Sequence, residues 1–505
     1  MTITDGSPNV VTSYESSSSG NSQKQSGTFY GGHKVINDPI HGHIQLDDYT
    51  VEFIDTVQFQ RLRDLKQLGS AYFVFPGASH NRFEHSIGVS HLAGTLVERF
   101  QRDQPELDIS ESELKCVKLA GLCHDLGHGP FSHVFDNEFM PRARPDLDWS
   151  HEQASEMVLE HLIDDNNIDI DKQEINLIKD LIAGTPRSQS QLSERRFLFD
   201  VVANKKNSVD VDKYDYIERD ALNLGLRSSY DAKRLLLYSR VIDDEICYHH
   251  KEVYNLYEMF HTRYSLFKRI YTHRVGKAIE YMITDALYHA DSELKISSAV
   301  DNPEDYLNLT DDILRTIERS KSPGLAKSRE IIKRLRTRDL YKFVDEFLLP
   351  SDMEARINKD LISAKELVSH QSDNDGLVEE DVIVNFLKIN YAMKDRNPVD
   401  SIRFFSKFND SESFNVPKQH VSYMIPSTFQ EVIVRIFTRH PEKTPAIQRA
   451  FRRLLKKVMP AGALKEPNMA LELPKDYDVL LGKRRRSASA QSFDNDIVKK
   501  WGPSQ

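Results

Sequence analysis

The spacing of apolar residues between about 50 and 290 constrains the fold of this chain more than any other feature of its sequence. Between Glu113 and His124, apolar side chains recur every three or four positions, as they do on one face of a helix. The stretch from Glu252 to Ala286 has the same spacing, and few segments nearby alternate apolar and polar residues as strands do. This region is therefore predicted to be mainly α-helical.

The sequence after about 300 mixes two kinds of pattern. It predicts helices over Asp311–Ser320, Leu325–Leu335, Gln430–Arg439 and Thr444–Val458, and strands over Leu377–Ile389 and Ser401–Phe408. Pro323 and Gly324 separate the first two helices. The expected fold class is mainly α, with a large helical core and a smaller mixed α/β C-terminal lobe.

Both ends of the chain are polar. Residues 1–28 are rich in Ser, Gly, Asn and Gln, and residues 466–505 contain the basic run Lys483–Arg486, so both are predicted to be disordered tails. The basic run is typical of a weak nuclear-import signal, or of a solvated charged tail. The predicted organisation is therefore a tail (1–28), a catalytic core (29–300), a regulatory or oligomerisation lobe (301–465) and a basic tail (466–505).

Composition limits the partners and the compartment. The chain has three cysteines, no CxxC pair, no signal peptide and no long apolar run, which favours a soluble protein of a reducing compartment, nuclear or cytoplasmic, with no membrane partner. Its formal net charge of −10 opposes strong non-specific binding to nucleic acid. A phosphate-bearing ligand would therefore need a local cluster of Lys and Arg.

The densest chemical signal is a cluster of histidines. Eight of the 19 histidines lie between His80 and His161, and His124 is followed directly by Asp125 near Gly127 and Pro130, which favour a bend. A His–Asp pair alone is more often a surface histidine beside a capping carboxylate. Here an upstream histidine and a downstream acidic segment complete a four-ligand set with open coordination positions: His85, His124, Asp125 and Asp212. Such donors suit a divalent transition metal (iron, zinc or manganese) better than calcium.

Further histidines and cations surround this set in the sequence. A histidine near a metal can protonate a leaving oxygen, a role that we favour for His128. His133 fits that role and the role of orienting a ligand equally well, and Asp136 suits the carboxylate partner of a catalytic histidine. Arg82, on the same helix face as His85, and Lys213, next to Asp212, are candidate phosphate-binding cations.

Five segments are long and specific enough to indicate a family: Asp38–His43, Gln58–Arg63, Val74–Ser86, Ala120–His133 and Asp210–Tyr216. Together they resemble the SAM-and-HD-domain deoxynucleoside triphosphate triphosphohydrolases of eukaryotes over roughly residues 30–460. The resemblance implies an HD-domain helical core that hydrolyses dNTPs to deoxynucleoside and inorganic triphosphate, and so controls the dNTP pool.

The same resemblance implies roles for residues of the site, with magnesium on the nucleotide phosphates. His128 and His151 would be catalytic, with Asp136 supporting them. Tyr271 would pack under the deoxyribose and exclude a 2′-hydroxyl. The substrate-binding set comprises Gln67, Leu68, Arg82, His133, Lys213, Tyr216, Asp220, Arg263 and Tyr271.

The resemblance also implies a homotetramer activated by nucleotides. The residues that match its GTP site are Lys34, Val35, Asp55, Gln60 and Arg63. Those that match its allosteric dNTP site are Asn37, Val74, Phe75, Arg234, Lys251, His273 and Arg274. Three departures from the family pattern bear on activator affinity: no SAM domain is expected, and His249 and Asn415 stand where the family pattern has arginines.

Two other functions are compatible with the same residues. An HD-type phosphodiesterase or nuclease would use the same metal site but release a monoester instead of triphosphate. A nucleic-acid-binding scaffold with a vestigial site is the second alternative, opposed by the intact ligand set and by the negative net charge.

Overall fold

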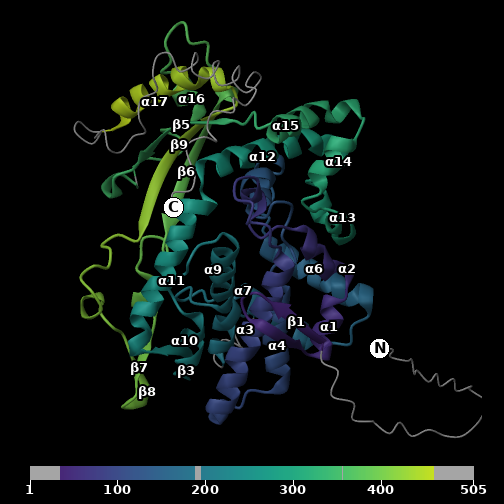
Figure 1. The fold of residues 1–505 in the computed structure, drawn as a ribbon, viewed down its shortest axis with the longest axis vertical. Coiled ribbons are helices and arrows are strands. Elements are labelled where there is room, and N and C mark those ends of the chain that lie inside the picture. The colour runs from purple at the N-terminus through teal and green to yellow at the C-terminus, as the bar shows by residue number, and fades with distance from the viewer. Residues whose placement is uncertain (1–33, 188–194, 355, 460–505) are drawn as a thin grey trace, which may run out of the picture.

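A computed structural model describes residues 34–187, 195–354 and 356–459. The two predicted tails and the basic run Lys483–Arg486 lie outside these residues. In the described part, no helix is long and apolar enough to cross a membrane. The prediction of a mainly helical core with a smaller mixed lobe is confirmed (Figure 1). The limits predicted for the domains stay a prediction.

The helical core begins with the hairpin of β1 (Lys34–Asp38) and β2 (Gly42–Leu46). Its first helices are α1 (Asp48–Ile54), α2 (Val57–Gln60), α3 (Arg82–Asp103), α4 (Glu111–Cys123), α5 (Met140–Ala143), α6 (His151–Asn166), α7 (Lys172–Ala183), α8 (Arg196–Val202), α9 (Val211–Asn223) and α10 (Ala232–Leu237). They are followed by α11 (Val253–Leu266), α12 (Arg274–Leu294), α13 (Pro303–Leu307), α14 (Ile313–Arg319) and α15 (Ala326–Arg336).

Helices α3 and α4 pack closely at the centre of this core, and glycine permits the approach. A Cβ at Gly121 of α4 would lie 3.1 Å from the Cα of Ser90 in α3. The helix predicted around Glu113–His124 is confirmed as α4, with Ser110 as its N-cap. The predicted helix over Glu252–Ala286 is divided, because a π-helical turn over Phe267–Tyr271 separates α11 from α12.

The C-terminal lobe is built on a three-stranded antiparallel sheet in the order β5 (Lys342–Leu348), β9 (Gln430–Thr438), β6 (Val382–Asn390). Helices α16 (Ala364–Val368) and α17 (Thr444–Val458) lie over it at the end of the molecule shown uppermost in Figure 1. Buried residues of both layers form a second hydrophobic core, which includes Phe347, Val434 and Phe451.

The helix predicted over Gln430–Arg439 is wrong, because that segment is the central strand β9. Its residues Val432, Ile433, Val434 and Ile436 are β-branched and buried, which suits a strand that is paired on both sides. The strand predicted over Ser401–Phe408 is shorter, β7 (Phe404–Ser406).

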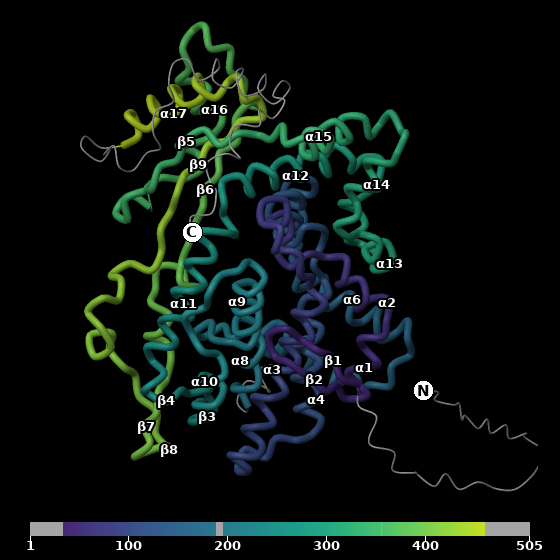
Figure 2. Tube along the Cα trace, viewed as in Figure 1, coloured from purple at the N-terminus to yellow at the C-terminus, as the bar shows by residue number. Residues whose placement is uncertain are grey.

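The chain returns from the lobe to the core through a second sheet. Strand β7 pairs in parallel with β4 (Glu245–His249), which also pairs with β3 (Ser239–Ile242), and β8 (Asn409–Phe414) forms the far edge. The tube in Figure 2 shows β7 and β8 beside β3 and β4, at the opposite end of the molecule from α17. Residues after 400 thus contact both ends of the helical core.

Candidate metal centre and active site

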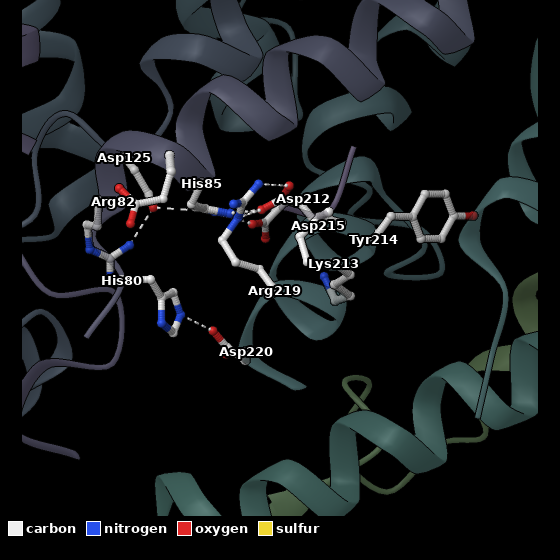
Figure 3. Close-up of polar contacts among 12 residues, drawn as sticks. His80, Arg82, His85, Asp125, Asp212, Lys213, Tyr214, Asp215, Arg219 and Asp220 are labelled. Atoms are coloured by element: carbon white, nitrogen blue, oxygen red, sulfur yellow. Dashed lines mark hydrogen bonds and ion pairs between the residues drawn. The ribbon is translucent and has the colours of Figure 1, made fainter. Parts of the chain in front are cut away.

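The four predicted metal ligands converge at one point, although they come from or directly follow three different helices. Figure 3 shows three of them, His85, Asp125 and Asp212. His85 lies in the first turn of α3, Asp212 lies in the first turn of α9, and His124 and Asp125 directly follow α4. The Oδ1 atom of Asp212 is 3.2 Å from Nε2 of His85 and 3.6 Å from Nε2 of His124. Asp125 approaches the same two imidazoles at 3.6 and 3.4 Å.

The hydrogen bonds of the two histidines fix which nitrogen faces the centre. Nδ1 of His85 is 2.7 Å from Oδ2 of Asp215, and Nδ1 of His124 is 2.8 Å from the carbonyl oxygen of Gly121. Both acceptors require a proton on Nδ1, so the lone pair of each imidazole lies on Nε2. In the described structure Nε2 of His124 is buried without a hydrogen-bond partner. This arrangement is typical of imidazoles that bind a metal ion.

The charges around the centre also fit a cation. Burial alone would lower the pKa of His85, but Asp212, Asp215 and Asp125 raise it to about 10. Carboxylates that stabilise a proton on His85 this strongly would also stabilise a divalent metal ion bound in place of that proton. The residues therefore fit a divalent ion, and their donors suit iron, zinc or manganese.

Behind the ligands lies a buried ion network that sequence reasoning did not assign to the site. Asp215 accepts hydrogen bonds from His85, from Nε2 of His41 at 2.6 Å and from two nitrogens of Arg219 at 2.8 Å. Arg219 also donates to Asp38 at 2.8 Å. Asp215 lies three positions after Asp212, on the same face of a helix, and that spacing was the available signal.

Gly88 makes room for this network. A Cβ at that position of α3 would lie 2.0 Å from Oδ1 of Asp215, which has no freedom to move among its four donors. Glycine at this point lets α3 and α9 approach until His85 and Asp215 share a hydrogen bond.

Replacing Asp215 tests whether it orients the metal-binding histidine. Asp215→Asn puts an amide group against N–H donors, so we expect metal affinity to fall roughly 10- to 100-fold. The measurement is the metal dissociation constant by competition with a chelator. The matched control is Glu218→Gln, on the same helix. Wild-type metal affinity in a folded Asp215→Asn protein would contradict this role.

Three further histidines, His128, His133 and His151, surround Asp136. Asp136 lies in a π-helical turn over Phe135–Phe139. Nδ1 of His151 is 2.7 Å from Oδ2 of Asp136, and the corresponding distances for His133 and His128 are 3.5 and 3.8 Å. The rings of His128 and His151 stack at 3.9 Å. Nε2 of His128 is 3.2 Å from Oδ1 of Asp125, so this group adjoins the metal ligands.

The two stacked histidines, His128 and His151, have pKa values shifted in opposite directions. Burial, Arg82 and His151 hold the pKa of His128 well below its ordinary value. Burial also opposes charge on His151, but Asp136 outweighs it and raises the pKa of His151. Asp136 itself has a lowered pKa, because its histidine neighbours outweigh its burial. The geometry thus favours a protonated His151 beside a neutral His128.

The loop that carries His128 and His133 is held from behind by buried polar groups. Arg61 donates to the carbonyl oxygens of Leu126 and His128, at 3.2 and 2.8 Å. Asp311 accepts the backbone N–H of Phe131 at 2.6 Å and that of Lys66 at 3.0 Å. Phe131 and Ser132 have φ values of 60° and 56°, a left-handed conformation that needs such support.

The loop supports give a second prediction. Asp311→Ala leaves two backbone N–H groups without their acceptor, so we expect a loss of about 3 kcal/mol in the free energy of unfolding. Urea denaturation measures it, and the exposed neighbour Asp312 supplies the control Asp312→Ala, with a change within about 0.5 kcal/mol. Equal stability of the two variants would show that Asp311 does not support the loop.

The site opens into one cavity of about 600 Å³. All four metal-ligand candidates line it, as do His128 and His151, whereas Asp136 lies behind the histidines. The complete predicted substrate-binding set lines it as well: Gln67, Leu68, Arg82, His133, Lys213, Tyr216, Asp220, Arg263 and Tyr271. The cavity also has lining residues that the sequence did not suggest, among them Asn204, Asp210 and Glu280.

Three of the cations that line this cavity are held by neighbouring side chains. Arg82 contacts Asp125 and donates to Oγ of Ser132 at 3.0 Å. Lys213 Nζ lies 3.1 Å from both oxygens of Asp210, whose side chain also caps α9. Arg263 donates to the hydroxyl oxygen of Tyr216 at 3.2 Å.

Two side chains that line the cavity, Tyr271 and Asp220, are hydrogen-bonded to each other, and His80 supports Asp220 from outside the lining. The hydroxyl of Tyr271 donates to Asp220, whose other oxygen is 2.7 Å from Nε2 of His80. The π-helical turn before α12 carries Tyr271, so the division of the predicted long helix is what brings this ring to the cavity. Asp220 is almost fully buried. Its hydrogen bond to His80 fixes the carboxylate, and its hydrogen bond from Tyr271 fixes the tyrosine ring.

The residues predicted for the GTP site lie together on the surface. Lys34 is 3.0 Å from Asp55, and Arg63 donates to Gln60 at 2.7 Å. Gln60 in turn donates to the carbonyl oxygen of Ile54, next to Asp55. Val35 is 56% exposed beside them.

The residues predicted for the allosteric dNTP site are spread over the single chain. Phe75 and His273 have ring centroids 5.4 Å apart, with Val74 and Arg274 as their chain neighbours. Arg234 contacts Glu252, next to Lys251, and Asn37 lies on β1. Two residues depart from the family pattern. His249 packs edge-on against Phe405, and Asn415 accepts a hydrogen bond from Arg403.

Comparison with known proteins places this site in a family. A model of the HD domain matches residues 82–220, and a model of the HD-associated region matches residues 230–413. The deoxynucleoside triphosphate triphosphohydrolase SAMHD1 homolog of Dictyostelium discoideum is 51% identical over 84% of this chain and 80% of its own length. The SAMHD1 proteins of Bos taurus and Homo sapiens are each 44% identical over 81% of this chain, and over 76% and 71% of their own lengths. The chain belongs to the SAMHD1 family.

The two matched regions contribute different parts of this SAMHD1-family cavity. The HD-domain match begins at Arg82 and ends at Asp220, so it contains all four candidate metal ligands and the Asp136 cluster. Arg263 and Tyr271 fall in the HD-associated region. A SAMHD1-family cavity of this shape therefore needs α11 and the turn before α12 as well as the HD domain.

Proposed function

We propose that this protein hydrolyses deoxynucleoside triphosphates to deoxynucleosides and inorganic triphosphate, and so controls the dNTP pool. One observation carries the proposal: Asp125 joins the metal-ligand candidates to the histidine cluster, at the end of a cavity lined by phosphate-binding cations. The names of the relatives, which are deoxynucleoside triphosphate triphosphohydrolases, support the choice of substrate.

The cleaved bond joins the 5′ oxygen to the α-phosphorus, so charge develops on the departing O5′ and on the α-phosphoryl oxygens. A divalent ion held by His85, His124, Asp125 and Asp212 would supply Lewis acidity toward phosphoryl oxygen and water at this position. Arg82 contacts the same carboxylate, and its remaining N–H groups would neutralise the α-phosphate. Lys213 and Arg263 would bind the outer phosphates, together with magnesium.

His151 is proposed to give its proton to the O5′ atom. The Asp136 carboxylate raises the pKa of His151 and so favours that proton on the imidazole, and the stacked His128 holds the ring in place. His133, 66% exposed at its side chain and 3.5 Å from Asp136, is proposed to contact the substrate phosphates.

Tyr271, held by Asp220, is proposed to select the sugar. Tyr271 is fixed by its hydrogen bond to Asp220, so its ring cannot easily move aside for a 2′-hydroxyl. Tyr216, Gln67 and Leu68 line the same cavity and would contact the nucleoside.

Product analysis tests this function directly. Purified protein with dNTPs and a divalent metal is expected to yield deoxynucleosides and inorganic triphosphate, as measured by ion-exchange chromatography. His124→Ala removes a ligand and should abolish turnover while the far-UV circular dichroism stays unchanged. A surface histidine distant from the site, in the variant His440→Ala, is the control. Monophosphate products would favour the phosphodiesterase or nuclease alternative.

The pH profile tests the role of Asp136. Because Asp136 raises the pKa of His151, the protonated imidazole persists to higher pH and is lost as the pH rises through that pKa. Asp136→Asn lowers the pKa of His151, so the alkaline limb of kcat should move to lower pH. The control is Asp164→Asn, which changes an exposed carboxylate of α6, the helix that begins at His151. It should leave the profile unchanged. An unmoved limb in Asp136→Asn would exclude His151 as the acid.

Activation by nucleotides is part of the proposal. The cluster of Lys34, Asp55, Gln60 and Arg63 supports a guanine site, because a carboxylate accepts from guanine N1–H and N2–H while Arg donates to O6 and N7. The spread of the second set over one chain fits a dNTP site completed by other subunits, as in the proposed homotetramer.

Removing the proposed guanine acceptor tests the first allosteric site. Asp55→Ala also frees Lys34, and we expect it to raise the GTP concentration for half-maximal activation at least tenfold without changing the metal content. Initial rates against GTP concentration measure this. Glu52→Ala, on the same helix α1, is the control. A GTP dependence identical to wild type would remove this assignment.

A further inference from the structure

A second cavity, of about 410 Å³, lies between the helical core and the sheet of the C-terminal lobe. One wall comes from the π-helical turn, α5 and α12 of the core, and the other comes from β6 and Arg439 at the end of β9. The proposed hydrolysis and its allosteric sites use none of the residues that line it.

The charged side chains of this cavity carry a positive excess. Arg142, Arg439 and Lys359 face two carboxylates, Glu138 and Asp285. Both arginines contact Asp285, with Nε of Arg439 at 2.7 Å from Oδ2, so two guanidinium groups share one carboxylate. Arg142 uses only Nη1 in that contact as described, which leaves N–H groups that suit an anion.

Buried polar atoms in the same wall lack a partner. Thr284 is 3% exposed, and its Oγ1 atom makes no hydrogen bond within the described residues. The same holds for Oδ1 of Asn385 on the opposite wall. A buried hydroxyl without a partner costs about 1–3 kcal/mol, and a polar ligand or bound water would remove that cost. These atoms indicate that the cavity is built to hold something polar.

One lysine, Lys277, connects lining residues of the second cavity and of the catalytic cavity. Lys277 donates to Glu138, which lines the second cavity, at 2.9 Å, and to Glu280, which lines the catalytic cavity, at 2.6 Å. This ammonium group neutralises Glu138 from behind, so the carboxylate does not repel an anion with a full charge. Asn137 and Glu138 directly follow Asp136 in the π-helical turn.

We propose that this cavity is a second anion site, which binds a small phosphate-bearing ligand between the two lobes. Arg142, Arg439 and Lys359 supply the charge, and the Thr284 hydroxyl donates to a phosphate oxygen. The volume suits pyrophosphate or a mononucleotide. Its ligand touches the two residues that directly follow Asp136, and therefore bears on the turn that orients His151.

Equilibrium dialysis of the full chain with labelled pyrophosphate tests the site by stoichiometry. Arg142→Gln removes one cation but leaves Asp285 paired with Arg439, and Thr284→Val removes only the hydroxyl. Each variant should bind one pyrophosphate fewer per chain than wild type, or bind it at least tenfold more weakly at one site. The control is Arg144→Gln, a neighbouring arginine that pairs with Asp301 away from the cavity.

Because only the difference from wild type is scored, pyrophosphate bound in the catalytic cavity does not affect the conclusion. Parallel dialysis with dAMP distinguishes the source of the phosphate: loss of pyrophosphate indicates an inorganic ligand, and loss of dAMP alone indicates a nucleotide. Either loss supports the site. Wild-type stoichiometry and affinity for both probes in Thr284→Val and in folded Arg142→Gln would overturn it.

Discussion

The carboxylate of Asp125 is where the metal-ligand candidates, the histidine cluster and Arg82 meet. It faces Nε2 of His85 and His124, lies 3.2 Å from Nε2 of His128 and contacts Arg82. Burial would raise its pKa, but Arg82, His124 and His128 lower it further than burial raises it. A charged carboxylate at this position holds the separate parts of the site at fixed distances from one another.

Such a concentration of buried charge is costly unless every charge has a partner. The fold meets this requirement with helix ends. His85 and Asp212 lie in first turns and His124 follows a last turn, so backbone groups as well as side chains are free to hydrogen-bond there. Behind them, Arg219 pairs with Asp215 and with Asp38 from the β1 strand. Helices α3 and α9 are thereby fixed by the same network that orients the candidate metal ligands.

The sequence predicted most of the site because its chemistry is local. The adjacent His124 and Asp125, with His85 and Asp212, have residue types that point to a transition metal, and the motifs around them identified the family. Asp215 escaped assignment because its role depends on how closely α3 passes α9, which one glycine decides in three dimensions. The roles assigned to individual side chains remain predictions, although the cavity gathers nearly all of those residues.

The fold shows the same division between local and long-range information. Helices such as α4 and α17 were predicted from apolar spacing, whereas β9 was predicted as a helix because a short buried apolar run has no distinctive period. Its pairing with β5 and β6, whose partner residues lie at least 40 positions away along the chain, decides the strand. The residues predicted for the allosteric dNTP site are likewise spread over the single chain. The distances between them in the folded protein are long-range information that sequence motifs do not contain.

The most direct test of the account is a single-turnover reaction in water enriched in oxygen-18. Attack of water on the α-phosphorus, next to Asp125 and the metal ligands, predicts one labelled oxygen in the inorganic triphosphate and none in the deoxynucleoside. Mass spectrometry of both products measures this. Label in the deoxynucleoside, or in a monophosphate or orthophosphate product, would contradict the proposed position of the metal site relative to the substrate.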